Sequence, residues 1–144
     1  MEKFRLTLAQ LNPTVGALAD NAAKARGAWE AARGAGADLL ALPEMFLTGY
    51  QTQDLVMKPA FVRDAERVLA DLAEACADGP AMAIGCPHFE NGTLYNAYAV
   101  LEGGTVAATI LKHHLPNTEV FDEVRLFSSG PVSGPYRVGP LRIG

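Results

Sequence analysis

Two ionisable residues follow apolar segments of the kind that form buried strands. Glu44 comes directly after ADLLALP, and Lys112 comes directly after VAATIL. The carboxyl end of a strand is where ligands bind in α/β sheets, and a carboxylate desolvated there is suited to accept a proton. A lysine in such a place can hold a fixed positive charge beside a reacting oxygen. Taken alone, Glu44 could equally be a surface loop residue, and a solvated lysine is the simpler interpretation of Lys112.

The remaining reactive side chains lack the partners that their chemistry needs. Cys76 and Cys86 do not form a CxxC pair and are interpreted as two reduced core thiols. His113 and His114 are adjacent, and neighbouring side chains on a strand point to opposite faces, so we expect no shared metal ion. No glycine-rich phosphate-binding motif is present, which argues against a flavodoxin-like nucleotide-binding module.

The composition is typical of one globular domain over residues 1–144. Hydrophobic residues make up 49% of the chain, charged residues make up 19%, and the net charge is −4. No basic surface for nucleic acid or an anionic membrane is expected. No apolar run reaches the length of a membrane span, and the first residues do not have the layout of a secretory signal. The predicted location is therefore the cytoplasm.

Hydrophobic periodicity predicts alternating strands and helices. Alternation indicates a strand over 4–8, and Asp20 or Asn21 is a plausible N-cap of a helix that ends near Arg33. The other predicted elements are a strand at 37–42, a helix at 61–76, strands at 81–86, 94–102 and 105–112, and a hairpin at 136–143. This order predicts an α/β fold whose sheet is parallel at first and becomes mixed where hairpins follow, as at Gly103-Gly104.

Separated motifs carry a family resemblance that covers essentially the whole chain. LPEMFLTGY (42–50) followed by LKHHLPN (111–117) resembles the first two signatures of the nitrilase superfamily. LTGYQTQDLV (47–56), VFDEVRLF (120–127) and the opening segment 3–24 look like the glutaminase domain of glutamine-dependent NAD(+) synthetases. The resemblance implies part of an α-β-β-α sandwich with a mixed sheet and a Glu-Lys-Cys triad.

The resemblance also implies roles for individual residues. Glu44 would be the general base, and Lys112 would stabilise the tetrahedral oxyanion. Glu123 matches a second glutamate that orients the lysine and the substrate. Tyr50 and Phe121 match positions that line the glutamine pocket. The implied reaction is attack of a cysteine thiolate on the side-chain amide of glutamine, release of ammonia, and hydrolysis of the thioester.

The sequence departs from the family pattern in two places. Thr118 stands where many relatives carry a tyrosine that contacts the substrate, and Glu119 follows where glycine is common, so glutamine binding is expected to differ locally. The last residues, LRIG (141–144), resemble the start of the family's strand that carries the nucleophilic cysteine, so the resemblance implies that this cysteine lies shortly past Gly144. Neither Cys76 nor Cys86 has the right place in the motif order to replace it. We therefore expect the 144-residue chain to be inactive alone and its uncovered sheet surface to seek a partner or aggregate.

The partners that the resemblance implies are glutamine, a C-terminal synthetase domain and further copies of the chain in a homo-oligomer. No cofactor is expected in this chain, whereas ATP and Mg²⁺ are expected for the synthetase domain, which would make NAD(+) from deamido-NAD(+). Two alternatives remain open. One is a stand-alone amidase or ω-amidase of the nitrilase superfamily, and the other is a non-catalytic fragment that serves only in assembly.

Overall fold

A mixed sheet forms the centre of the molecule. In the computed structural model, which describes residues 3–143, five strands lie in the order β1-β2-β3-β4-β5. Their bounds are β1 Leu6–Leu8, β2 Leu39–Ala41, β3 Ala81–Glu90, β4 Thr93–Glu102 and β5 Thr105–Leu111. The pairs β1–β2 and β2–β3 are parallel, and the pairs β3–β4 and β4–β5 are antiparallel. The predicted α/β fold with a mixed sheet is confirmed.

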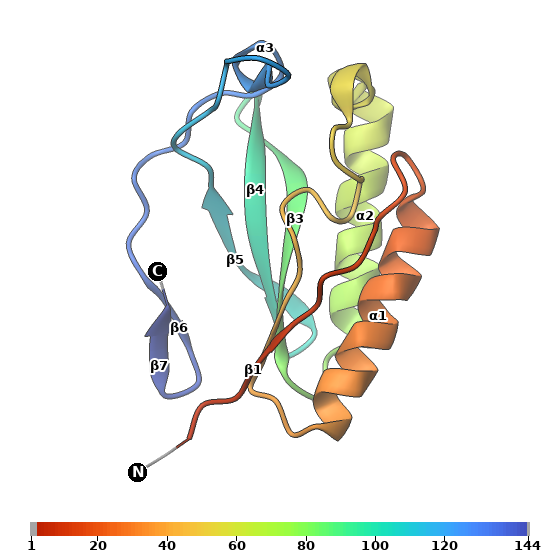
Figure 1. The fold of residues 1–144 in the computed structure, drawn as a ribbon, viewed down its shortest axis with the longest axis vertical. Helices are drawn as coiled ribbons and strands as arrows, with labels where there is room; N and C mark the ends of the chain where they lie inside the picture. Colours follow the sequence, from red (N-terminus) through yellow and green to blue (C-terminus); the bar gives the residue numbers. More distant parts are fainter. Residues whose placement is uncertain (1–2, 144) are drawn as a thin grey trace.

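This topology brings the carboxyl ends of two distant strands to the same end of the sheet. Because β4 reverses the direction of β3 and β5 reverses it again, β5 runs in the same direction as β2. The segments that follow β2 and β5 therefore both emerge at the end of the sheet that carries α3 (Glu123–Leu126) in Figure 1. These are the segments that contain Glu44 and Lys112.

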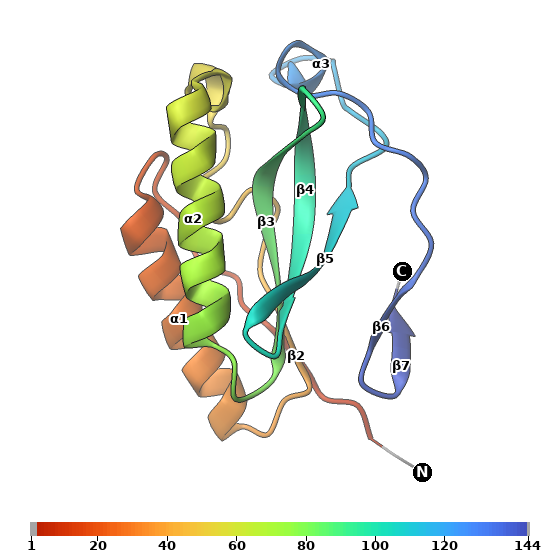
Figure 2. The same ribbon diagram turned by 180° about the vertical axis from the view of Figure 1, so that it is seen from behind.

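Two long helices cover one face of the sheet. The helices α1 (Leu18–Gly34) and α2 (Pro59–Ala75) lie side by side on that face in both views, and the short helix η1 (Gln53–Met57) precedes α2 (Figures 1 and 2). Their apolar faces bury Trp29 and Leu69 against residues of the sheet such as Ile84. The indole Nε1–H of Trp29 donates to the carbonyl oxygen of Pro80 at 2.8 Å, so its polar group is satisfied in the core.

The predicted N-cap of the first helix is wrong. The helix begins at Leu18, and Asn21 lies inside its first turns as a fully buried residue. Its side chain accepts from the amide of Thr14 and donates to the carbonyl oxygens of Thr14 and Leu47. Asn21 therefore ties two loops together, a tertiary role that a capping pattern cannot distinguish from a helix start.

The hairpin of β6 (Tyr136–Val138) and β7 (Leu141–Ile143) lies on the face of the sheet opposite the helices, as the two views show (Figures 1 and 2). Val138 packs into a cluster with Leu39, Ala83 and Val100. This hairpin, which was predicted from the sequence, covers only part of that face. Among the described residues, no helix is long and apolar enough to cross a membrane.

Candidate active site

The segment that follows β2 crosses closely over β3 at Gly85. The amide of Gly85 donates to the carbonyl oxygen of Pro43, and the amide of Leu47 donates to that of Gly85. A Cβ atom on Gly85 would lie 2.1 Å from the backbone nitrogen of Met45 and 2.6 Å from Cα of Glu44. Only glycine permits this approach, which carries Glu44 across β3 towards the neighbouring strands.

Lys112 meets two carboxylates at the end of β5. Its Nζ lies 2.7 Å from Oε1 of Glu44 and 2.9 Å from Oε2 of Glu123, with Oε1 of Glu123 at 3.1 Å. The three residues come from three separate segments of the chain. The structure thus brings together Glu44, Lys112 and Glu123, the three residues for which the resemblance implied catalytic or orienting roles.

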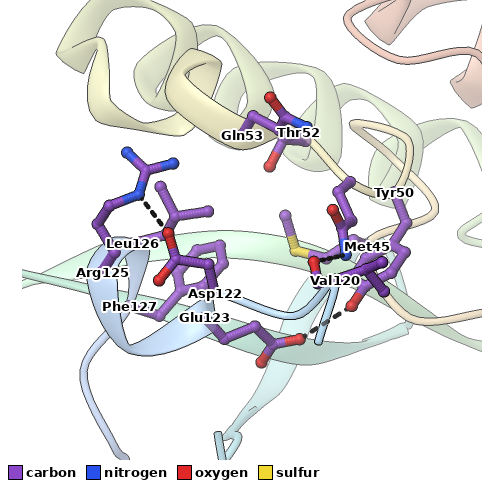
Figure 3. A pocket seen from close by; sticks show the side chains of 11 residues that line it. Met45, Tyr50, Thr52, Gln53, Val120, Asp122, Glu123, Arg125, Leu126 and Phe127 are labelled. Carbon is purple, nitrogen blue, oxygen red and sulfur yellow. Dashed lines mark hydrogen bonds and ion pairs between the residues drawn. The ribbon is translucent and has the colours of Figure 1, made fainter. Parts of the chain in front are cut away.

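Glu123 is the buried member of this cluster. It is the first residue of α3 and only 4% exposed. Its carboxylate receives hydrogen bonds from Lys112 and from the hydroxyl of Tyr50, which lies 3.2 Å from Oε1 (Figure 3). A buried charge is stable only when it is paired in this way, so Glu123 is fixed in orientation and in turn fixes Lys112.

Asn96 is a residue of the site that sequence reasoning missed. It lies in β4, is 2% exposed, and donates from Nδ2 to Oε1 of Glu44 at 2.6 Å. Its backbone carbonyl accepts the amide hydrogen of Lys112 at 2.8 Å. The available signal was an asparagine inside the otherwise apolar strand YNAYAV, where a buried amide requires a polar partner.

The expected desolvation of Glu44 is contradicted by the structure. Its side chain is 47% exposed, because Glu44 faces a hollow on the side of the sheet away from the helices. Lys112, Asn96, Tyr98 and Ile110 also line this hollow, whose volume is about 370 Å³. The carboxylate of Glu44 is therefore hydrogen-bonded and accessible to solvent in the hollow, not desolvated.

The pKa values of two site residues respond to their neighbours. Partial burial by itself lowers the pKa of Lys112, but the hydrogen bonds and charges of Glu44 and Glu123 outweigh it and raise the pKa above its ordinary value. Lys112 is therefore a fixed cation at neutral pH. Burial also raises the pKa of Tyr50, with a further contribution from the charge of Glu123, so its hydroxyl stays protonated and can donate.

A second, smaller cavity lies on the other side of Glu123. It has a volume of about 170 Å³ and is lined by Met45, Tyr50, Glu123 and Arg125 among others (Figure 3). Arg125 holds its outer rim through ion pairs with an aspartate of η1 (Asp54) and with Asp122. These pairs are exposed, so we regard them as positional rather than as a large source of stability.

Two residues with a predicted role in substrate binding lie outside both cavities. Thr118 and Phe121 are exposed, and neither lines the hollow at Glu44 or the cavity beside Tyr50. The amide of Phe121 donates to the carbonyl oxygen of Thr118 at 3.0 Å, which places both in one turn before α3. Their contact with a substrate stays a prediction.

Neither cysteine lies in the cluster of charged residues. Cys86 follows Gly85 directly, but its side chain points to the opposite face of the sheet and packs in the core beneath the helices with Ile84. Burial raises the pKa of the Cys86 thiol to about 12. Cys76 ends α2 in the same core, and burial raises its pKa as well. Both cysteines are therefore placed as structural thiols.

The geometry combines a carboxylate base and a fixed cation beside one hollow. Glu44 presents a carboxylate to the hollow, Lys112 presents a positive charge next to it, and Glu123 with Asn96 holds both in position. Proton abstraction next to a developing negative charge requires such a pair. The arrangement is thus suited to acyl transfer with a nucleophile placed over the hollow.

Residues 5–144 match the family model of carbon-nitrogen hydrolases. The chain therefore belongs to the carbon-nitrogen hydrolase family. Within this family the chain is 64% identical over 143 residues to the glutamine-dependent NAD(+) synthetase of Rhodobacter capsulatus. The aligned region covers 99% of this chain and 26% of that protein. It is also 37% identical to the glutamine-dependent NAD(+) synthetase of Thermotoga maritima, over 100% of this chain and 25% of that protein.

Solved structures agree with this assignment. The glutamine-dependent NAD(+) synthetase of Acinetobacter baumannii superposes with a TM-score of 0.90 at 31% identity, over 96% of this chain and 26% of that one. The amidase of Nesterenkonia sp. AN1 has the same fold, with a TM-score of 0.78 at 22% identity over 97% of this chain and 55% of that one. The chain spans about a quarter of the length of the curated relatives it matches.

Proposed function

We propose that this chain supplies the glutamate and the lysine of a Glu-Lys-Cys triad that hydrolyses the side-chain amide of glutamine. The observation that carries the proposal is the ion cluster, in which Nζ of Lys112 lies 2.7 Å from Glu44 and 2.9 Å from Glu123. Similarity to proteins that are glutamine-dependent NAD(+) synthetases supports glutamine as the substrate.

Each residue of the cluster has a defined task in the proposed reaction. Glu44 takes the thiol proton of the cysteine, and the sulfur attacks the amide carbon of glutamine. Lys112 stabilises the negative charge that forms on the amide oxygen. Glu44 gives the proton to the nitrogen that leaves as ammonia. It then takes a proton from the water that attacks the thioester carbon, and it returns that proton to the sulfur as the C–S bond breaks and glutamate is released. Glu123 holds the lysine in place throughout.

The cysteine of the triad is assigned to a segment past residue 144. Cys86 and Cys76 are buried beneath the helices, on the opposite face of the sheet from Glu44. A triad without its nucleophile retains only the effects of binding and charge, so the 144-residue chain by itself should be inactive. An acrylamide adduct on the active-site cysteine of the Nesterenkonia amidase supports a thiol nucleophile in this fold.

The released ammonia would pass to a synthetase domain. That domain would amidate adenylylated nicotinate dinucleotide to NAD(+), with ATP and Mg²⁺ bound there rather than by this chain. We also propose that the native polypeptide assembles into a homo-oligomer. Native mass spectrometry of the polypeptide as the cell makes it would report its length and its number of copies.

Ammonia release from glutamine tests the proposed activity. The native polypeptide should release ammonia, and alkylation of its thiols with iodoacetamide should abolish the release. The Cys76→Ala and Cys86→Ala variants should keep both the activity and its sensitivity to alkylation, because neither thiol reaches the hollow. Loss of alkylation sensitivity in either variant would contradict the assignment of the nucleophile. Faster turnover of simple amides than of glutamine would favour the stand-alone amidase.

A further inference from the structure

The carboxylate of Glu44 is held in an asymmetric way. Among the described residues, the hydrogen bonds to its side chain all end on Oε1, with Asn96 Nδ2 at 2.6 Å and Lys112 Nζ at 2.7 Å. A carboxylate oxygen that accepts two short hydrogen bonds from such donors is a poor proton acceptor, because its lone pairs are engaged. Oε2 of Glu44 accepts neither of these hydrogen bonds.

Asn96 bonds to both members of the catalytic pair. Its side-chain amide donates to Glu44, and its backbone carbonyl accepts the amide hydrogen of Lys112 at 2.8 Å. Its position is itself fixed, since β4 pairs with β3 and β5 along most of its length and Asn96 is 2% exposed. A strand that is paired on both sides is a rigid support, which a loop residue would not provide.

We infer that Asn96 is a positioning residue that selects which oxygen of Glu44 acts as the base. With Lys112 it occupies Oε1, so that Oε2 takes the proton. The inference deepens the proposed function and rests on it. In the first step the thiol S–H bond breaks and an O–H bond forms at Oε2, while the sulfur electron pair forms the bond to the amide carbon. The carbonyl π pair moves onto the oxygen beside Lys112, so atoms and charge balance.

The prediction concerns the acidic limb of the profile of kcat/KM against pH. A carboxylate that loses a hydrogen-bond donor holds its proton more firmly, so removal of the Asn96 donor should shift this limb to higher pH. In Asn96→Leu the donor is lost at similar side-chain volume. In Asn96→Asp a second carboxylate replaces the donor, and the pair must share a proton, so the shift should be larger. KM for glutamine should change less than about threefold, because Asn96 acts through Glu44.

A control lies at the turn between β4 and β5. The hydroxyl of Thr105 donates to the carbonyl oxygen of Glu102 at 3.2 Å, and neither residue lines the hollow. Thr105→Ala removes one side-chain hydrogen bond from the same pair of strands, and its acidic limb should stay where the unmodified protein has it. An unshifted limb in a folded Asn96→Asp or Asn96→Leu protein would overturn the inference, and so would an equal shift in Thr105→Ala.

Thermal unfolding gives a readout that does not depend on activity. If Asn96 binds Glu44, the Tm loss of the double variant Asn96→Leu/Glu44→Gln should differ from the sum of the single losses by a few degrees. Additive losses would overturn the contact. A native polypeptide without glutaminase activity would contradict the proposed function, and the unfolding cycle would then decide the Asn96 contact alone.

Discussion

Gly85→Ala should displace Glu44, the proposed base, while the rest of the fold persists. A Cβ atom at Gly85 would lie 2.1 Å from the backbone nitrogen of Met45 and 2.6 Å from two backbone atoms of Glu44. These are main-chain atoms, so no side-chain rotation relieves the contact. The crossing segment must retreat by roughly 1 Å or more to reach ordinary van der Waals distance.

Two magnitudes follow from this displacement. Overpacking of a well-packed site costs about 1–3 kcal/mol, which corresponds to a fall in Tm of roughly 3–10 °C for a domain of this size. A shift of 1 Å also breaks the 2.7 Å contact between Lys112 and Glu44, and misplacement on that scale lowers turnover by roughly 10²-fold. Calorimetry on the chain and glutaminase kinetics on the native polypeptide measure the two effects separately.

The same substitution elsewhere in the chain serves as a control. Gly27 lies inside α1, and a Cβ atom there would meet nothing within 4 Å. Gly27→Ala should therefore raise the stability by about 0.5–1 kcal/mol and leave turnover unchanged. If Gly85→Ala kept both the Tm and the turnover of the unmodified protein, the close crossing would not be what positions Glu44.

Three other predictions concern buried or charged groups. Asn21→Leu should lower the stability by about 2 kcal/mol or more, because backbone groups of Thr14 and Leu47 lose their partner; denaturant unfolding measures this, and a loss below about 0.5 kcal/mol would contradict it. Since the pKa of Lys112 is raised in the folded chain, its stabilising contribution should be complete below the ordinary value of 10.5 and be lost as the pH rises through the higher folded value. The Tm difference between the unmodified chain and Lys112→Met should therefore shrink only above about pH 10.5. If this difference shrank between pH 6 and 8 instead, the upward direction of the Lys112 pKa shift would be refuted. Cys86, whose pKa is about 12, should not react with a thiol reagent at pH 8 until the chain unfolds, as mass spectrometry of labelled peptides can show.

Much of the scaffold could be predicted because it depends on local patterns. A continuous apolar run located β2, and apolar residues at helical spacing located α2. The Gly103-Gly104 pair located the turn between β4 and β5. The positions of Glu44 and Lys112 after two strands followed from the same patterns. The order of parallel and antiparallel pairs then places the carboxyl ends of β2 and β5 at the same end of the sheet.

The contacts within the site could not be predicted because they are tertiary. Asn21 looks like a helix cap in sequence, yet its side chain ties together two loops. A glycine inside a strand, such as Gly85, looks unfavourable in the sequence. The structure shows why glycine is needed there: the backbone of the segment after β2 crosses β3 at this point. Asn96 is visible in the sequence only as a polar residue in an apolar strand, and the fold is needed to show that it meets Glu44. The resemblance implied that Glu123 orients the lysine, but the burial of Glu123 is evident only in the fold. The exposure of Glu44 depends on which face of the sheet the helices cover.

The most direct test of the account compares two glutamate-to-glutamine substitutions in the native polypeptide. Glu44→Gln removes the proposed base from the ion cluster, whereas Glu74→Gln changes an exposed carboxylate on α2. The measurement is the rate of ammonia release from glutamine at saturating substrate. We expect a loss of about 10³-fold for Glu44→Gln and no loss for Glu74→Gln. Turnover of folded Glu44→Gln at the rate of the unmodified protein would contradict the account.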